Sequence, residues 1–162
     1  MADRQRGQFD ILYVTTTDPT SGTNTDPTDP ANYTRVGLLQ DLGDEFTNET
    51  DTTVDRDTGK HEDAVATTQS SSVDVTCNVQ KSDGGTPGED AGQLIFRNAA
   101  QDQDRVWFLI NPEDSGGSTR TGLELVHGSG VVESFSYTRN QGDFKQFESS
   151  LTNKEQPTYT TA

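Results

Sequence analysis

Apolar and polar residues alternate most regularly in residues 70–80, where Val73, Val75, Cys77 and Val79 occupy every second position. This period of two predicts a strand of an antiparallel sheet, with one face in the core and the other in solvent. Cys77 belongs to the apolar face of that strand. It is therefore predicted to be a small core residue rather than a nucleophile.

Shorter apolar segments bounded by turn residues predict further strands. They cover residues 9–14, 33–42, 105–110 and 144–151, together with a pair of strands in 120–139 that is broken near Gly128 and Gly130. The segment RVWFLI at 105–110 is almost continuously apolar and stops at Asn111 and Pro112. A run of this kind is typical of a strand that is buried on both faces.

One helix is predicted after residue 86. Thr86 as N-cap, Pro87 at the first helical position and Glu89 three residues after the cap fit a capping box. An apolar stripe at helical spacing follows, made of Ala91, Leu94, Ile95 and Ala99. We expect this helix to end near Gln101 and to lie beside the strand at 105–110.

The remaining stretches are polar. Residues 15–32 are dense in Thr, Asp, Pro and Gly, which predicts a loop or arm. Residues 43–63 are acidic and nearly devoid of aliphatic side chains, which predicts a long acidic loop of the kind that tends to be functional. Phe46 within it is interpreted either as an anchor that fits a neighbouring molecule or as a side chain that folds back onto its own domain. Residues 152–162 are predicted to form a C-terminal arm.

These elements together predict a single domain over residues 1–162. Its fold class is mainly β: an antiparallel β-sandwich or partly closed barrel of about seven strands, with one α-helix and long loops. A core with so few aliphatic residues is marginal for an isolated chain, because hydrophobic residues make up only 28% of the sequence. Contacts between subunits are therefore expected to add stability.

Charge narrows the function classes. The chain has 27 Asp and Glu against 12 Lys and Arg, a net charge of −15. A DNA-binding face needs clustered Lys and Arg, so that class is excluded. No apolar run approaches the length of a membrane span, and the single cysteine excludes an internal disulfide and a Cys-rich zinc site. The acidic bias favours adaptation to molar salt, with an ordinary acidic surface as the alternative.

Patterns that could carry chemistry are weak. Asp57-Thr58-Gly59 matches the short signature of aspartic proteases, but no apolar strand precedes it to bury the aspartate. The acidic cluster around it could hold a cation yet lacks EF-hand spacing, because Lys60 stands where that loop requires glycine. His61 and His127 have no evident third partner. The sequence therefore predicts no catalytic residue, no cofactor and no metal site.

The order of parts resembles a known family. The segment VGLLQDLGDEF, an acidic stretch ending in TGKHED, the helix EDAGQLIFRNAA, the strand RVWFLI and the closing stretch from GLELVHGSGVVESFSY onward follow one another. This order resembles that of the major tail (tail tube) proteins of long-tailed viruses with non-contractile tails. The likeness covers most of residues 33–159 and is strongest in the closing stretch. With the salt-adapted composition, it indicates a virus of a halophilic archaeon.

The resemblance implies a non-enzymatic virion protein, made in the host cytoplasm and without a membrane partner. Six-membered rings of the subunit would stack into a hollow tail tube, through which double-stranded DNA passes without specific binding. Other partners would be tape-measure and tail-end proteins. The 43–63 segment corresponds in position to the family's stacking loop, which gives as candidate contacts between rings Phe46, Asp51, Asp55, Asp57 and Lys60. Candidates for the lumen are Asp74 and Glu133.

Two alternatives stay open. A capsid-decorating or tail-completion protein would share the β-sandwich but needs fewer contacts between rings, so the long 43–63 segment favours the tube. A small halophilic binding module or hydrolase would need polar side chains that converge on rigid elements. The sequence offers no such set.

Overall fold

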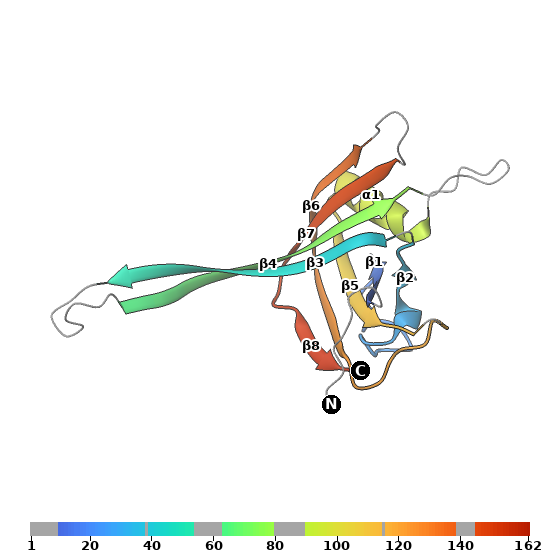
Figure 1. Cartoon of the computed structure of the whole chain (residues 1–162), viewed down its shortest axis with the longest axis horizontal. Coiled ribbons are helices and arrows are strands. Elements are labelled where there is room, and N and C mark those ends of the chain that lie inside the picture. The colour runs from blue at the N-terminus through green and yellow to red at the C-terminus, as the bar shows by residue number, and fades with distance from the viewer. Residues whose placement is uncertain (1–9, 38, 54–62, 80–89, 115, 139–144) are drawn as a thin grey trace.

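The computed structural model describes residues 10–37, 39–53, 63–79, 90–114, 116–138 and 145–162. Its eight strands belong to one antiparallel sheet that is not closed, with one α-helix against it (Figure 1). The predicted fold class, mainly β with a single helix, is confirmed.

The strands follow the order β2-β1-β5-β6-β7-β4-β3 across the sheet, and β8 pairs with β6. Their bounds are β1 Asp10–Thr15, β2 Thr34–Arg35, β3 Leu39–Thr53, β4 Asp63–Asn78, β5 Arg105–Pro112, β6 Glu124–Thr138, β7 Gln146–Asn153 and β8 Thr158–Thr161. A short 3-10 helix, η2, covers Pro30–Asn32. Every pairing between these strands is antiparallel.

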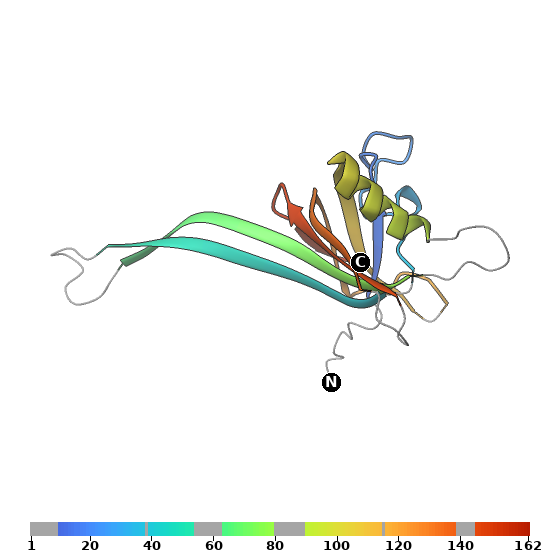
Figure 2. The same ribbon diagram turned by 90° about the horizontal axis from the view of Figure 1, so that it is seen from above.

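The core lies between one face of the sheet and helix α1, Ala91–Asp102 (Figure 2). Alternate residues of the central strands point to it, as the period of two predicts. The buried set includes Leu12, Val14, Val73, Val75, Cys77, Val106, Phe108, Phe147 and Leu151. From the helix, Phe96 and Ala99 enter the same core. Cys77 is fully buried, so its predicted place as a core residue is confirmed.

The helix begins later than the sequence predicts. Its N-cap is Asp90, whose carboxylate accepts hydrogen bonds from the backbone amides of Gly92 and Gln93 at 3.1 and 3.4 Å. The same carboxylate accepts one from the amide of Gly37 at 2.9 Å, which ties the helix start to the chain after β2. The prediction of Thr86 as N-cap is therefore wrong. Thr86 itself lies outside the described residues.

Two further expectations are corrected. Strand β6 runs unbroken through Gly128 and Gly130, which serve close packing rather than a turn. A Cβ on Gly128 would lie 3.1 Å from the ring of Phe108. The segment 152–162 is not a free arm, because β7 extends to Asn153 and β8 pairs with the start of β6.

Residues 16–29 form a loop held by its own aspartates. Asp18 and Asp26 each accept two hydrogen bonds from the threonine two positions later, through its amide at 2.9 Å and its hydroxyl at 2.7 Å. The loop lies against the face of the sheet opposite the helix, where its prolines and Trp107 line one pocket of about 340 Å³.

Candidate assembly surface

The most prominent feature is a long hairpin made of β3 and β4. The two strands stay paired as far as Thr53 and Asp63, whereas β4 pairs with β7 only between Ser72 and Asn78. Beyond that point the described hairpin residues pair only with each other. Figures 1 and 2 show the hairpin extending well away from the rest of the sheet.

The hairpin corrects the expectation of a loop over residues 43–63. Residues 43–53 are strand, because threonine favours the extended backbone and each residue finds a partner on β4. The pattern of the sequence hides this strand because both of its faces are polar there. Asp51 lies on it, opposite Val65. Asp55, Asp57 and Lys60 lie outside the described residues.

Such a hairpin is only marginally stable by itself. From Phe46 to Thr53 it extends about 23 Å at the usual rise of a strand. A two-stranded ribbon is only marginally stable in water, and both of its edges carry backbone groups that can pair with another chain. The hairpin is therefore suited to binding a neighbouring molecule.

Phe46 lies where the hairpin leaves the body of the protein. It is the exposed large hydrophobic residue of the described chain, with 40% of its surface accessible. Its ring centroid lies 5.5 Å from that of Tyr159 on β8. The side chain thus folds partly back onto its own domain and keeps a free surface as well. Its role as an anchor for a neighbour stays a prediction.

The sheet has a second polar surface opposite the helix, which we call the polar face. Directly opposed residues of antiparallel strands share a face, so the pairings align three rows across β3, β4, β7 and β6. The rows are Asp41, Thr76, Glu148 and Ser136; Gly43, Asp74, Ser150 and Ser134; and Glu45, Ser72, Thr152 and Val131. Glu133 joins the third row at a bulge of β6, where its carboxylate accepts a hydrogen bond from the Thr152 hydroxyl at 2.5 Å.

The two lumen candidates, Asp74 and Glu133, are therefore both exposed on the polar face. Within β3, β4, β7 and β6 these three rows contain neither lysine nor arginine, but the third row continues from Val131 to Arg105 on β5. The adjacent cation is Arg105 on β5, which forms an ion pair of 3.5 Å with Glu155 and lies 5.1 Å from the Trp107 ring.

Comparison with known proteins bears on this arrangement. No family model matches the chain, and no curated protein matches its sequence. Solved structures do match. A chain from the tail of an empty gene transfer agent particle with C6 symmetry gives a TM-score of 0.66 at 15% identity, over 97% of this chain and 99% of that one. A chain of the SPP1 tail tube gives 0.65 at 14% identity, over 98% and 80%. The fold is a tail-tube fold.

A third match extends the comparison to contractile machines. A chain from the sheath–tube complex of an extracellular contractile injection system has a TM-score of 0.59 at 12% identity, over 94% of this chain and 88% of that one. The tail-tube fold is thus shared by chains from particles of different kinds. The likeness covers nearly the whole of this chain, including the hairpin strands.

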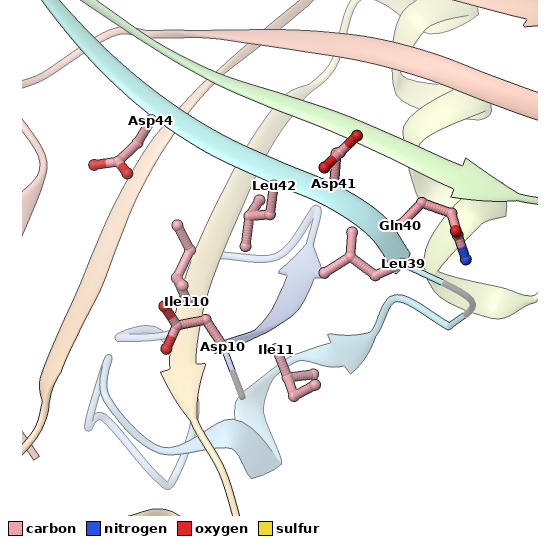
Figure 3. Close-up of a pocket in the computed structure, with 8 residues that line it drawn as sticks. All are labelled: Asp10, Ile11, Leu39, Gln40, Asp41, Leu42, Asp44 and Ile110. Atoms are coloured by element: carbon pink, nitrogen blue, oxygen red, sulfur yellow. The ribbon is translucent and has the colours of Figure 1, made fainter. Parts of the chain in front are cut away.

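The tail-tube fold leaves an open seam between β3 and the strands β1 and β5. A pocket of about 410 Å³ marks it. Figure 3 shows the side chains of Leu39, Leu42 and Ile110 gathered in this opening, with Asp44 at one side. No backbone pairing between the described residues of β3 and β1 closes the sheet here, so side chains alone bridge the seam.

The described residues offer no evident reactive centre. They contain no group of three His, Cys, Asp or Glu side chains placed to hold a metal ion, and none of their helices is long and apolar enough to cross a membrane. Burial raises the pKa of the Cys77 thiol to about 12, which keeps it protonated and unreactive at neutral pH. Burial also lowers the pKa of His127, which lines the pocket beside Trp107.

Proposed function

We propose that this protein is the tail tube subunit of a long-tailed virus with a non-contractile tail. Copies assemble into six-membered rings that stack into a hollow tube, and the subunit has no catalytic role. The observation that carries the proposal is the hairpin of β3 and β4 projecting from a tail-tube fold. Archaeal host and salt adaptation rest on the acidic composition.

The hairpin is the proposed contact between rings. A polar two-stranded ribbon with unpaired edges has little stability on its own, whereas pairing with a neighbouring subunit satisfies the hydrogen-bonding groups of its backbone. The free part of the Phe46 side chain would then lie in that contact, as would Asp51 further along the same strand. Asp55, Asp57 and Lys60 follow in the sequence and are proposed for the same contact.

The polar face is the proposed wall of the lumen. Asp74 and Glu133 lie on it among hydroxyl side chains, and the arginine that ends the row of Glu133, Arg105, forms an ion pair with Glu155. Phosphates of double-stranded DNA would find no cluster of cations there and could slide past. In molar salt the repulsion between carboxylates and phosphates reaches only about 3 Å. For the passage of DNA, the lack of attraction therefore matters more than this repulsion. Tape-measure and tail-end proteins would contact the same tube.

Excision of the hairpin tests the proposal. The register permits a clean cut: residues 47–70 are replaced by Asn-Gly, a two-residue turn that joins the opposed pair Phe46 and Ser71. Electron microscopy of the full chain in high salt should show hollow tubes with a regular axial repeat. The excised variant should stay folded, as judged by circular dichroism, and form no stacked tubes.

The opposite results are equally clear. Normal tubes from the excised variant would refute the hairpin as the contact between rings. Discrete particles from the full chain at every salt concentration would refute the tube and favour a decorating or tail-completion subunit.

A further inference from the structure

Where the hairpin leaves the sheet, three ties connect it to the C-terminal part of the chain. The Tyr159 hydroxyl on β8 donates a hydrogen bond to the Asp44 carboxylate on β3 at 2.5 Å. The Tyr159 ring also contacts Phe46, two residues further along β3. On the other strand of the hairpin, the Asn153 side-chain amide donates to the Ser71 hydroxyl at 2.8 Å. We call these five residues the hairpin clasp.

We infer that Tyr159 is the positioning residue that sets the direction in which the hairpin projects. This inference rests on the proposed function only for its consequence, which is the correct placement of the hairpin against the next ring. The clasp itself is a property of the single subunit.

The anchor of Tyr159 is firm. Strand β8 pairs with the start of β6, with Tyr159 opposite Val126. The end of the chain is held as well, because Ala162 donates to the Leu123 carbonyl and accepts from the Gly122 amide, both at 2.8 Å. Tyr159 packs against the core beside these contacts. Its side chain therefore starts from a fixed backbone.

The other end of the contact has no such support. Strand β3 is the edge of the sheet and has only β4 as a paired neighbour. No described residue of β8 pairs with β3 through the backbone. Asp44 also lies beside the open seam in Figure 3. The hydroxyl and ring of Tyr159 thus bridge a part of the fold that the sheet leaves unclosed.

A contact at the base of the hairpin affects the position of its far end. The hairpin extends about 23 Å beyond Phe46, so a tilt of about 10° at its base moves Thr53 by about 4 Å. That is close to the spacing between neighbouring strands, and it would shift a backbone pairing by one strand position. A fixed base also restricts the motion of the hairpin before binding, so less conformational entropy is lost when the hairpin binds.

The test measures the direction of the hairpin in the unassembled subunit. Nitroxide labels are placed at Thr52 on the hairpin and at exposed Asn98 on α1, in a Cys77→Val background. Pulsed electron spin resonance then gives the distribution of distances between the labels. Tyr159→Phe removes the hydroxyl and keeps the ring. Asp44→Asn keeps an acceptor oxygen, and Thr161→Ala changes an exposed residue of the same strand.

We expect a narrow distribution for the parent and for Asp44→Asn and Thr161→Ala, and a distribution about twofold wider for Tyr159→Phe, since the hairpin then samples several orientations. Phe46→Leu provides a second variant that disturbs the ring contact without removing the hydroxyl. Circular dichroism confirms that each variant is folded. A Tyr159→Phe distribution as narrow as the parent's would overturn the inference.

The tube assay separates this inference from the proposed function. If the parent forms tubes, Tyr159→Phe should need a several-fold higher protein concentration to do so, because only a fraction of its hairpins is correctly placed. If the parent forms no tubes while Tyr159→Phe still widens the distribution, the positioning role stands and the proposed function fails.

Discussion

Gly130 on β6 lies so close to Thr152 on β7 that a Cβ at Gly130 would be 2.1 Å from the Thr152 carbonyl oxygen. The two strands can approach this closely only because one side chain is absent. Just beside this point the amide of Lys154 donates to the Ser129 carbonyl at 2.9 Å. The glycine thus lets β7 end against β6 before the chain continues into β8.

Gly130→Ala should therefore be strongly destabilising. The added methyl group meets backbone atoms of β7, so the strands must separate, and we expect a loss of about 3 kcal/mol in the free energy of unfolding. Urea denaturation followed by circular dichroism measures it. The matched control is Gly43→Ala, because a Cβ at Gly43 on β3 has no atom within 4 Å. Equal effects of the two substitutions would contradict this account of β6.

Stability should fall at alkaline pH. Burial raises the pKa of Cys77 from 9.0 to about 12, and burial together with the nearby Glu113 raises the pKa of Tyr13 from 10.0 to about 12. Both groups stay protonated longer in the folded state. Their contribution to the free energy of unfolding is therefore complete below pH 9 and is lost as the pH rises toward 12.

For the fully buried Cys77, the loss is about 1.4 kcal/mol for each pH unit within this window. Urea titrations at pH 8, 9, 10 and 11 measure the slope. Cys77→Val removes the thiol at similar volume, so its slope should be smaller than that of the parent. An identical slope in this variant would show that Cys77 contributes nothing to it.

Acidification should open the loop at residues 16–29. Hydrogen bonds from Thr20 and Thr28 lower the pKa values of Asp18 and Asp26. The contribution of these carboxylates to the stability of the loop is therefore present above pH 3.8 and is lost as the pH falls below it. Trp107, the one tryptophan of the chain, lines the pocket under this loop. Its fluorescence should shift to longer wavelength as the loop leaves.

His127 adds a step at higher pH in the same acid titration. Burial lowers its pKa below 6.5, so its contribution to stability declines as the pH falls from 6.5. The double variant Asp18→Asn and Asp26→Asn keeps acceptor oxygens without a titrating carboxyl. It should lose the fluorescence change below pH 3.8 and keep the His127 step. If this variant showed the full fluorescence change below pH 3.8, protonation of Asp18 and Asp26 would not be its cause.

Dilution of salt should dissociate the proposed tube. Each subunit carries 15 excess negative charges, and the screening length grows from about 3 Å at 1 M salt to about 10 Å at 0.1 M. Sedimentation and electron microscopy across this range measure the change. A double variant with Asp74→Asn and Glu148→Gln, on neighbouring rows of the polar face, should tolerate lower salt. Tubes that persist unchanged in dilute buffer would contradict adaptation to molar salt.

The sequence by itself determined the features that depend on local pattern. The alternation around Val73, Val75 and Cys77 is sufficient to predict a half-buried antiparallel strand, because the period of side chains along a strand is fixed. The helix is predicted as well, but its buried face is formed by Gln93, Phe96 and Ala99, so of the predicted stripe only Ala99 is fully buried. Its N-cap, Asp90, also depends on a contact with the distant Gly37. Charge composition likewise predicts, without reference to the fold, that the chain has no cationic nucleic-acid face.

Only the tertiary structure decided how distant polar residues are combined. A strand that is polar on both faces has no period to read, so residues 43–53 look like a loop until β4 pairs with them. Asp74 and Glu133 share a face because β7 lies between their strands in one register. Tyr159 reaches Asp44 across 115 positions of chain because the sheet curves and stays open at its seam. Such contacts depend on register and curvature of the whole sheet, which no local segment encodes.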